Sequence, residues 1–313
     1  MRYAAPAWLP GGHLQTIWPA LFLQQPALSF RRERWNTPDQ DFIDLDFIDG
    51  EPGKPLLILF HGLEGSSGSH YARALMHAAR ERGWSGVVPH FRGCSGEMNL
   101  APRFYHSGDS GEIHWILQGL RERFHDRPLY VAGVSLGGNA LLRWLGESGS
   151  SAGFVSAAAA VSAPLDLAKG GAGLSRGLNR LYTHMFLHTL KPKCLQKLTQ
   201  YPGLFDRSRL LAAKNLYEFD NVVTAPLHGY RDTDDYWHRA SARHVLHDIR
   251  VRTLVLNARN DPFLPGRYLP SGAAACVTLD YPEHGGHVGF TSGKLPGHLQ
   301  WLPDRLLNFF GMD

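Results

Sequence analysis

Short apolar runs that alternate with helix-like segments constrain the fold of this 313-residue chain more than any other feature. Each run is apolar over the length of a strand and ends in glycine or polar turn residues, which is typical of strands buried on both faces. The runs occupy residues 54–62, 85–93, 127–135, 153–164 and 252–261. Segments with the spacing of amphipathic helices lie at 69–83, 110–124 and 136–147. This alternation predicts an α/β fold in which helices cover both faces of a mostly parallel sheet.

Two segments depart from this alternation. "RRERW" (31–35) and "DFIDLDFIDG" (41–50) alternate by twos, which predicts an antiparallel hairpin at one edge of the sheet. Residues 165–240 show helical periodicity and no clear strand, although they lie between two predicted core strands. We therefore expect this segment to form a helical insertion, here called the cap. The predicted core is the rest of the chain, 1–164 and 241–313, with an N-terminal extension over about residues 1–30.

The composition excludes several classes of function. Hydrophobic residues make up 43% and charged residues 19% of the chain, and the net charge is only +4. Acidic residues interleave with the basic ones, and the one basic run, "RRER", fits a solvated strand face, so we expect no nucleic-acid partner. No dinucleotide-binding or P-loop glycine motif is present in the sequence, and we expect no cofactor.

The three widely spaced cysteines, Cys94, Cys194 and Cys276, indicate neither a disulfide framework nor a zinc site. A reducing compartment is the expected setting for such a chain. "PGG" at 10–12 interrupts the N-terminal segment, which does not have the pattern of a secretory signal. No window approaches the ~20 apolar residues needed to span a bilayer. The sequence therefore predicts a cytoplasmic protein, and it leaves transient contact with a membrane surface and the oligomeric state open.

The pattern G-x-S-x-G presents a nucleophilic serine on a sharp strand-to-helix turn, and it is centred here on Ser135, Ser151 and Ser175. Such a turn needs an apolar strand before the serine and a helix directly after it. Ser135 meets both requirements because "LYVAGV" precedes it and "LGGNALLRWLG" follows. Ser151 lies in a polar glycine-serine loop, and Ser175 lies at the mouth of a cap helix, where serine is a common N-cap. We therefore predict that Ser135 is the nucleophile.

A serine nucleophile needs a basic histidine and a third group that fixes the histidine tautomer. In this architecture the acid and then the histidine follow the serine, at the ends of later strands. Asp261 follows the strand-like run "RTLVLNARN" and is the predicted acid, with Asp166 after "VSAPL" as the alternative. "PEHGGHVGF" follows the last strand-like run and offers His284 and His287. The two glycines before His287 let its loop approach another backbone closely, which favours His287 as the base.

Two backbone N–H groups are needed to hold the oxyanion that forms at a substrate carbonyl. Leu136, directly after the serine, is expected to supply one. Leu63 is expected to supply the other, because it follows His61 and Gly62 after the strand "LLILF". Gly62 and Gly65 permit the tight backbone path that this loop requires. We assign His61 itself a structural role.

Two other groups of reactive side chains are weaker candidates. "HMFLH" places His184 and His188 one helical turn apart, as metal ligands can be, but no third ligand is evident. We therefore assign no metal site. Cys94, in "FRGCSGE", has no base assigned to it and is expected to be a packed thiol.

Six motifs in a fixed order resemble the α/β-hydrolase superfamily and, within it, the YheT-like branch of esterases. The motifs are "GGHLQTIWP", "HGLEGSSGSHYAR", "HFRGCSGEMN" with "YHSGD", "GVSLGGNALLRWLGE", "NARNDPF" and "GGHVGF", and they cover nearly the whole chain. The resemblance implies a triad of Ser135, Asp261 and His287, a helical cap over the cleft, and hydrolysis of carboxylic esters. Bacterial members of this branch look like general esterases, and related eukaryotic members act on glycerolipids and phospholipids.

The sequence thus predicts a cofactor-free serine esterase that acts on a small-molecule ester through an acyl-enzyme. An acyltransferase, a thioesterase or a glycerolipid lipase would use the same triad, and these stay as alternatives together with a non-catalytic binding protein. Apolar cap side chains at helical spacing should pack mostly on the core, and the remainder should line a pocket for short-to-medium acyl chains. These side chains are Leu178, Leu181, Tyr182, Met185, Phe186 and Leu187.

Overall fold

The computed structural model describes residues 2–312 and contains one eight-stranded sheet with the order β1-β2-β4-β3-β5-β6-β7-β8. The strands β3 to β8 run parallel to their neighbours among themselves, whereas β2 pairs antiparallel with both β1 and β4. The predicted mostly parallel sheet with an antiparallel hairpin at one edge is confirmed. The strand bounds are β1 (Arg31–Asn36), β2 (Phe42–Ile48), β3 (Leu56–Phe60), β4 (Ser85–Pro89), β5 (Leu129–Val134), β6 (Ala157–Val161), β7 (Thr253–Leu256) and β8 (Val277–Asp280).

Cross-strand ion pairs hold the edge hairpin together. Arg32 of β1 donates to Asp46 of β2 at 2.7 Å, and Arg34 donates to Asp44 at 2.8 Å. Alternate residues of a strand share one face, so these four side chains form a charged face on the hairpin. The basic run "RRER" therefore belongs to an ion-paired strand face.

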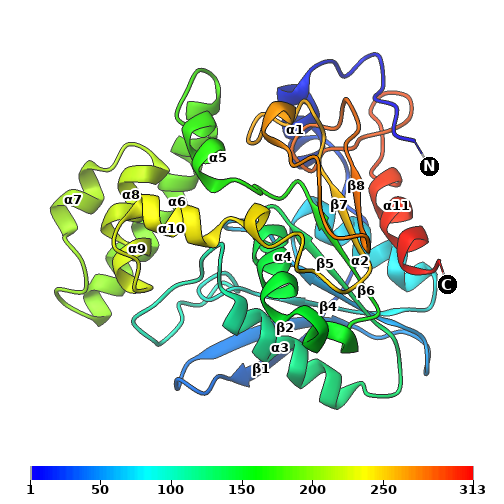
Figure 1. The fold of residues 1–313 in the computed structure, drawn as a ribbon, viewed down its shortest axis with the longest axis horizontal. Helices are drawn as coiled ribbons and strands as arrows, with labels where there is room; N and C mark the ends of the chain where they lie inside the picture. The colour runs from blue at the N-terminus through cyan, green and yellow to red at the C-terminus, as the bar shows by residue number, and fades with distance from the viewer. Residues whose placement is uncertain (1, 313) are drawn as a thin grey trace.

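Helices pack on both faces of the sheet (Figure 1). On one face lie α3 (Ser110–Arg123) and α4 (Leu136–Ser148), and on the other lie α2 (His70–Glu81) and α11 (Trp301–Phe310). Every residue of β3, β5 and β6 is buried, because each faces one of these two helical layers. This two-sided burial is the reason that the central strands are apolar throughout rather than alternating.

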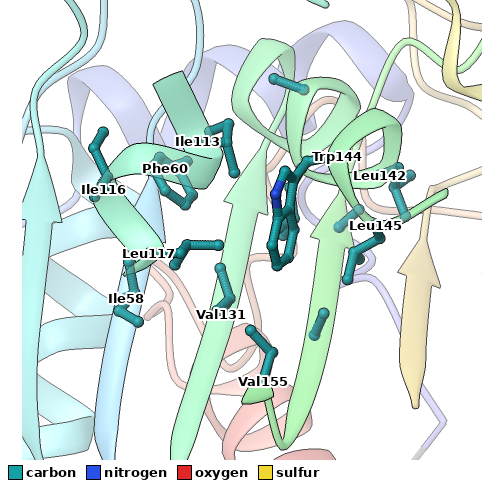
Figure 2. Packing of buried hydrophobic residues seen from close by; sticks show 14 of the residues in the cluster. Ile58, Phe60, Ile113, Ile116, Leu117, Val131, Leu142, Trp144, Leu145 and Val155 are labelled. Carbon is teal, nitrogen blue, oxygen red and sulfur yellow. The ribbon is translucent and has the colours of Figure 1, made fainter. Parts of the chain in front are cut away.

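The larger apolar cluster fixes α4 against β5 (Figure 2). Trp144 of α4 is only 1% exposed, and its indole Nε1 donates to His114 Nδ1 at 3.2 Å. Leu117 of α3 and Val131 of β5 belong to the same cluster. Each fully buried side chain of this size contributes about 1.5–3 kcal/mol relative to an exposed one. The first turn of α4, which follows Ser135, is therefore held on a rigid support.

A helical insertion lies between β6 and β7, as predicted, and its helices gather at one side of the molecule (Figure 1). Asp or Asn side chains cap four of these helices, at Asp166, Asp206, Asn215 and Asp232. The helices are α5 (Leu167–Leu174), α6 (Asn179–Gln200), α7 (Arg207–Ala212), α8 (Leu216–Val222), α9 (Thr224–Leu227) and α10 (Thr233–Ala240). The treatment of residues 165–240 as a unit separate from the core stays a prediction.

The remaining short elements lie in the N-terminal extension and in the core loops. They are the helix α1 (Gly12–Leu21) and the 3₁₀ turns η1 (Gly149–Phe154), η2 (Ala242–His244) and η3 (Gly266–Tyr268). No helix among residues 2–312 combines the length and the apolar character needed to cross a bilayer.

Candidate active site

Ser135 lies on the turn between β5 and α4 and has a φ of 53°. A positive φ is unfavourable for a residue with a side chain, so surrounding contacts must hold the turn in place. A Cβ on Gly133 would lie 2.5 Å from the Gly137 oxygen, and a Cβ on Gly137 would lie 2.4 Å from the His61 oxygen. Both glycines of G-x-S-x-G are therefore needed for β5, α4 and the end of β3 to meet at the serine.

The structure brings the three predicted side chains together from three separate loops. His287 Nε2 lies 3.0 Å from Ser135 Oγ, and His287 Nδ1 lies 2.9 Å from Asp261 Oδ2. Asp261 is 1% exposed, and its Oδ1 also accepts the Phe263 N–H at 2.8 Å. Phe263 stacks on the His287 ring with centroids 4.0 Å apart. Because the carboxylate accepts Nδ1–H, the Nε2 lone pair is directed at the serine hydroxyl.

The alternative acid and the alternative histidine lie outside this chain of hydrogen bonds. Asp166 caps the first turn of α5 and pairs with Arg243. His284 is exposed on the loop after β8. Neither side chain bonds to Ser135 or His287 in the part of the chain that the structure describes.

The loop after β3 approaches the serine closely. A Cβ on Gly62 would lie 3.1 Å from Ser135 Cβ. The N–H groups of Gly62 and Glu64 each donate to a tyrosine hydroxyl at 2.8 Å. Within residues 2–312, the N–H groups of Leu63 and Leu136 make no hydrogen bond, and both residues line the cavity that contains the serine. The two predicted oxyanion donors are thus free N–H groups beside Ser135.

Comparison with known proteins identifies the family. Residues 55–293 match the family model described as "alpha/beta hydrolase fold". The chain belongs to the α/β-hydrolase family. It is 40% identical to the "Putative esterase YheT" of Escherichia coli (strain K12) over 94% of this chain and 88% of the relative. It is 31% identical to "Phospholipase ABHD3" of Mus musculus over 98% of this chain and 77% of the relative.

Solved structures show the same fold for this α/β hydrolase. The esterase EaEST from Exiguobacterium antarcticum matches with a TM-score of 0.56 at 16% identity, over 90% of this chain and 99% of that chain. An esterase from Pyrococcus furiosus matches with a TM-score of 0.57 at 14% identity, over 90% of this chain and 88% of that chain. At such low identity the likeness concerns the fold alone.

Buried His61 supports the loop that carries Leu63 in this hydrolase. Its Nε2 accepts the Phe91 N–H at 3.0 Å, so Nδ1 carries the proton and donates to the Gly62 oxygen at 2.8 Å. Burial lowers the pKa of His61 to about 3, so the ring is neutral near pH 7. These contacts fit the structural role expected for His61.

Glu64 connects the same loop to the cap, a role that sequence reasoning missed. Its φ is 56°, a left-handed conformation directly after Leu63. Tyr105 OH accepts the Glu64 N–H at 2.8 Å and donates to Oε1 at 2.9 Å. Lys193 Nζ of α6 contacts both carboxylate oxygens, at 2.8 and 2.9 Å. A cap side chain thus fixes the loop whose free N–H lies beside the serine.

Helix α1 supports the histidine loop, which sequence reasoning also missed. Thr16 Oγ1 accepts the His287 N–H at 2.8 Å, and Gln15 Oε1 accepts the Gly285 N–H at 2.8 Å. A Cβ on Gly286 would lie 2.8 Å from the Thr16 nitrogen, which explains the glycine before His287. Because the Thr16 contact spans 271 residues of sequence, no local spacing pattern could have revealed it.

A cavity of about 130 Å³ extends from Ser135 into the cap and has mostly apolar walls. Of the six apolar cap residues singled out from the sequence, Phe186 lines this cavity, whereas Tyr182 and Leu187 are buried in packing contacts. The others lie on the outer side of α6, so the expectation that unpacked residues line the pocket is wrong for Leu178, Leu181 and Met185.

The remaining sequence candidates do not join the site. Ser151 lies in η1, and Ser175 ends α5 rather than capping the start of a helix, with its Oγ bonded back to a carbonyl of that helix. His184 and His188 are exposed, and no group of three or more His, Cys, Asp or Glu in residues 2–312 is arranged to hold a metal ion. Burial raises the pKa of Cys94 to about 12, so its thiol is protonated at neutral pH.

Proposed function

We propose that this protein hydrolyses carboxylic esters through an acyl-enzyme on Ser135. The observation that carries the proposal is the continuous chain of hydrogen bonds from Ser135 Oγ through the His287 ring to Asp261, at 3.0 and 2.9 Å. A serine on a strained strand-to-helix turn, with a histidine base and a buried carboxylate in reach, is the arrangement used for acyl transfer.

Each side chain has a defined role in the proposed reaction. His287 Nε2 accepts the hydroxyl proton as Ser135 Oγ attacks the ester carbonyl, and Asp261 stabilises the imidazolium that forms. The N–H groups of Leu63 and Leu136 hold the oxyanion of the tetrahedral intermediate. The imidazolium then gives its proton to the departing alkoxide. In the second half, His287 deprotonates a water molecule, which attacks the acyl carbonyl and releases the acid and free Ser135.

The names of the relatives agree in the kind of bond that is broken. The Escherichia coli relative is named an esterase and the mouse relative a phospholipase, and both names denote hydrolases of esters. The cavity walls beside Ser135 are mostly apolar, which favours an ester with an apolar acyl chain. We therefore extend ester hydrolysis, with a lipid-like small molecule as substrate, to this chain.

The size of the cavity limits the acyl chain that fits without rearrangement. The space of about 130 Å³ is slightly smaller than the ~150 Å³ engineered cavity that holds a benzene molecule. Acyl chains of up to about six carbons should therefore fit, which is a short-to-medium length. Each methylene that fits contributes about 0.8 kcal/mol, so kcat/KM should rise by up to about fourfold per carbon and then decline.

Covalent labelling tests the nucleophile directly. An organophosphonate should add once to the full chain, as intact mass would show, and peptide mapping should place the adduct on Ser135. Ser135→Ala should keep the fold and lose the adduct and most turnover. An adduct on Ser151 or Ser175 would refute the assignment.

A series of p-nitrophenyl esters from acetate to palmitate tests the cavity. A fall in kcat/KM from acetate onward would contradict the proposed acyl pocket. A maximum at palmitate would indicate a long-chain lipase. Adding alcohol or thiol acceptors to the same assay separates hydrolysis from acyl transfer.

A further inference from the structure

The outer face of α6 carries an apolar row that the proposed reaction does not use. Leu178, Leu181 and Met185 recur at helical spacing and are 66%, 64% and 63% exposed. Single exposed apolar side chains are common on protein surfaces. Three such side chains on one helical face form an apolar stripe, which indicates contact with another apolar phase. These three residues are called the outer row.

Basic side chains flank the outer row without acidic partners. Arg176 and Arg180 are exposed, and neither guanidinium forms an ion pair within residues 2–312. The segment 167–205 contains six Lys and Arg and no Asp or Glu. Three of these six already bond to oxygens of this protein, namely Lys191, Lys193 and Lys197. Free positive charge is therefore concentrated beside the outer row.

The outer row lies on the outside of the same helical turns that wall the cavity. Phe186 directly follows Met185, lines the cavity and packs against Phe263, with ring centroids 6.1 Å apart. Phe263 in turn stacks on His287. A surface that contacts the outer row is thus separated from the cavity by about one helix diameter, ~10 Å.

We propose that the outer row, together with Arg176 and Arg180, docks this protein on an anionic lipid surface. Insertion of the apolar side chains of one helix face below the headgroups lowers the free energy of the bound state. Attraction of adjacent basic residues to anionic headgroups lowers it further. This docking inference rests on the proposed ester hydrolysis in one respect. Docking brings the cavity close to lipid-like esters, which are the proposed substrates.

A second copy of this chain fits the outer row less well than an anionic surface does. A two-fold contact places the same patch of both copies face to face. The arginines of both copies would then meet with no acidic side chain in the segment 167–205 to neutralise them. Like charges in contact oppose such an association.

Vesicle flotation tests the proposal on the full chain carrying Ser135→Ala, so that hydrolysis cannot alter the lipid. The vesicles contain either phosphatidylcholine alone or equal parts of phosphatidylcholine and phosphatidylglycerol. The protein should bind the mixed vesicles at least ~10-fold more tightly, because each arginine near an anionic surface contributes about a fivefold gain. Added salt should reduce this difference by screening.

Substitutions in the outer row separate its contribution from that of the charges. Leu181→Asn and Met185→Gln, which add no charge, should each lower binding to mixed vesicles by ~10-fold or more. Arg176→Gln combined with Arg180→Gln should lower binding to mixed vesicles by about 20-fold and leave binding to pure phosphatidylcholine unchanged. Leu211→Asn and Arg207→Gln, both exposed on α7 of the same cap, are the matched controls and should bind as the parent does.

Three outcomes would overturn the proposal. Outer-row variants could bind vesicles like the parent, or Leu211→Asn could weaken binding equally. A changed oligomeric state on size-exclusion chromatography, with vesicle binding unaltered, would assign the outer row to self-association. The same substitutions with Ser135 intact should hydrolyse a soluble short-chain ester normally, which shows that they fold. If the unsubstituted protein bound vesicles but hydrolysed no ester, the proposed function would be contradicted and the docking inference would not.

Discussion

Asp261 accepts His287 Nδ1–H, and Asp261→Asn keeps the shape of the side chain while removing its charge. The substitution favours the wrong imidazole tautomer, so kcat should fall by about 10⁴, as for the equivalent change in the chymotrypsin-type triad. Steady-state kinetics on a soluble ester measure the loss. Asp166→Asn is the control, because asparagine can still cap α5 and the substitution removes only the ion pair with Arg243, so kcat should change little. A severe loss in the control and a mild one at Asp261 would move the acid to Asp166.

The residues of the proposed triad were predictable because each leaves a local signature in the sequence. Ser135 lies within a strand-to-helix glycine motif, Asp261 directly follows an apolar run, and His287 follows a glycine pair. Glu64 and Thr16 leave no such signature. Their roles depend on partners in distant elements, Lys193 of the cap for Glu64 and the His287 backbone for Thr16. Such pairings become visible only once the chain is folded.

At the scale of elements, α6 and the loop after β3 are coupled through one ion pair. Lys193→Met would leave the Glu64 carboxylate, whose side chain is 9% exposed, without its cation. An unpaired buried charge is unfavourable, so the carboxylate should move and displace the Leu63 N–H from Ser135. We expect kcat to fall by about 10-fold while KM changes much less.

Two companion variants make this test specific. Lys193→Arg keeps the pair and should retain most activity. Lys191→Met removes an ammonium group that, within residues 2–312, bonds only to the cap carbonyls of Leu211 and Ala213, and it should leave kcat unchanged. Equal losses in Lys191→Met and Lys193→Met would show that general damage to the cap, and not the pair with Glu64, affects the reaction.

Helix α1 and the histidine loop are coupled by a hydrogen bond that can be removed without changing shape. Thr16→Val leaves the His287 N–H without an acceptor, at a cost of about 1–3 kcal/mol if the loop stays in place. The loop should shift instead, and kcat should fall by about 10-fold or more with little change in KM. Thr16→Ser restores the acceptor and should restore kcat. Full activity in Thr16→Val, measured with a soluble ester, would contradict a positioning role for α1.

Elements were predictable where two-sided burial leaves continuous apolar runs, as in β3, β5 and β6. The sequence was less informative in the cap. Ser175 follows a glycine-rich stretch and was expected at a helix start, but it ends α5, because the glycines themselves are helical. Helical periodicity likewise identified six apolar residues in the first turns of α6 and its N-cap. It did not show which face of this helix is exposed to solvent. Burial of a cap helix depends on the opposing surface, and the spacing of its own residues does not encode that surface.

For the molecule as a whole, the acid Asp220 in the cavity wall makes stability depend on pH. Its oxygens accept from Thr224 Oγ1 at 2.6 Å and Trp237 Nε1 at 2.8 Å, and burial raises its pKa to about 6. The unfolded carboxyl releases its proton near pH 3.8, so the folded state binds more protons between about pH 4 and 6. Stability should therefore fall across this window, by about 2–3 kcal/mol, and this contribution should be constant at higher pH.

Asp220→Asn isolates this contribution. The amide resembles the protonated carboxyl, so the variant should have a Tm a few degrees above that of the unsubstituted protein at pH 8 and about the same Tm near pH 4. Thermal unfolding at both pH values measures the difference. Equal shifts at the two pH values would show that packing, and not the charge of Asp220, is responsible.

The layered architecture of the whole molecule was predictable because strands that feed helices on both sides allow few alternatives. The path of the N-terminal extension was not predictable from the sequence. α1 folds against the loop after β8, so the first and last parts of the chain meet beside Ser135. A contact between such distant segments depends on the assembled sheet between them.

The hydrogen bond between Thr16 and the His287 backbone has a consequence for biosynthesis. A ribosome releases the chain from its N-terminus, so α1 and Ser135 emerge well before His287 is made. In the proposed mechanism the nascent chain therefore holds a nucleophile with no base, and it cannot acylate itself on lipids that it meets during synthesis. In that mechanism, hydrolysis becomes possible only after the segment that carries His287 has been made and has folded back onto α1.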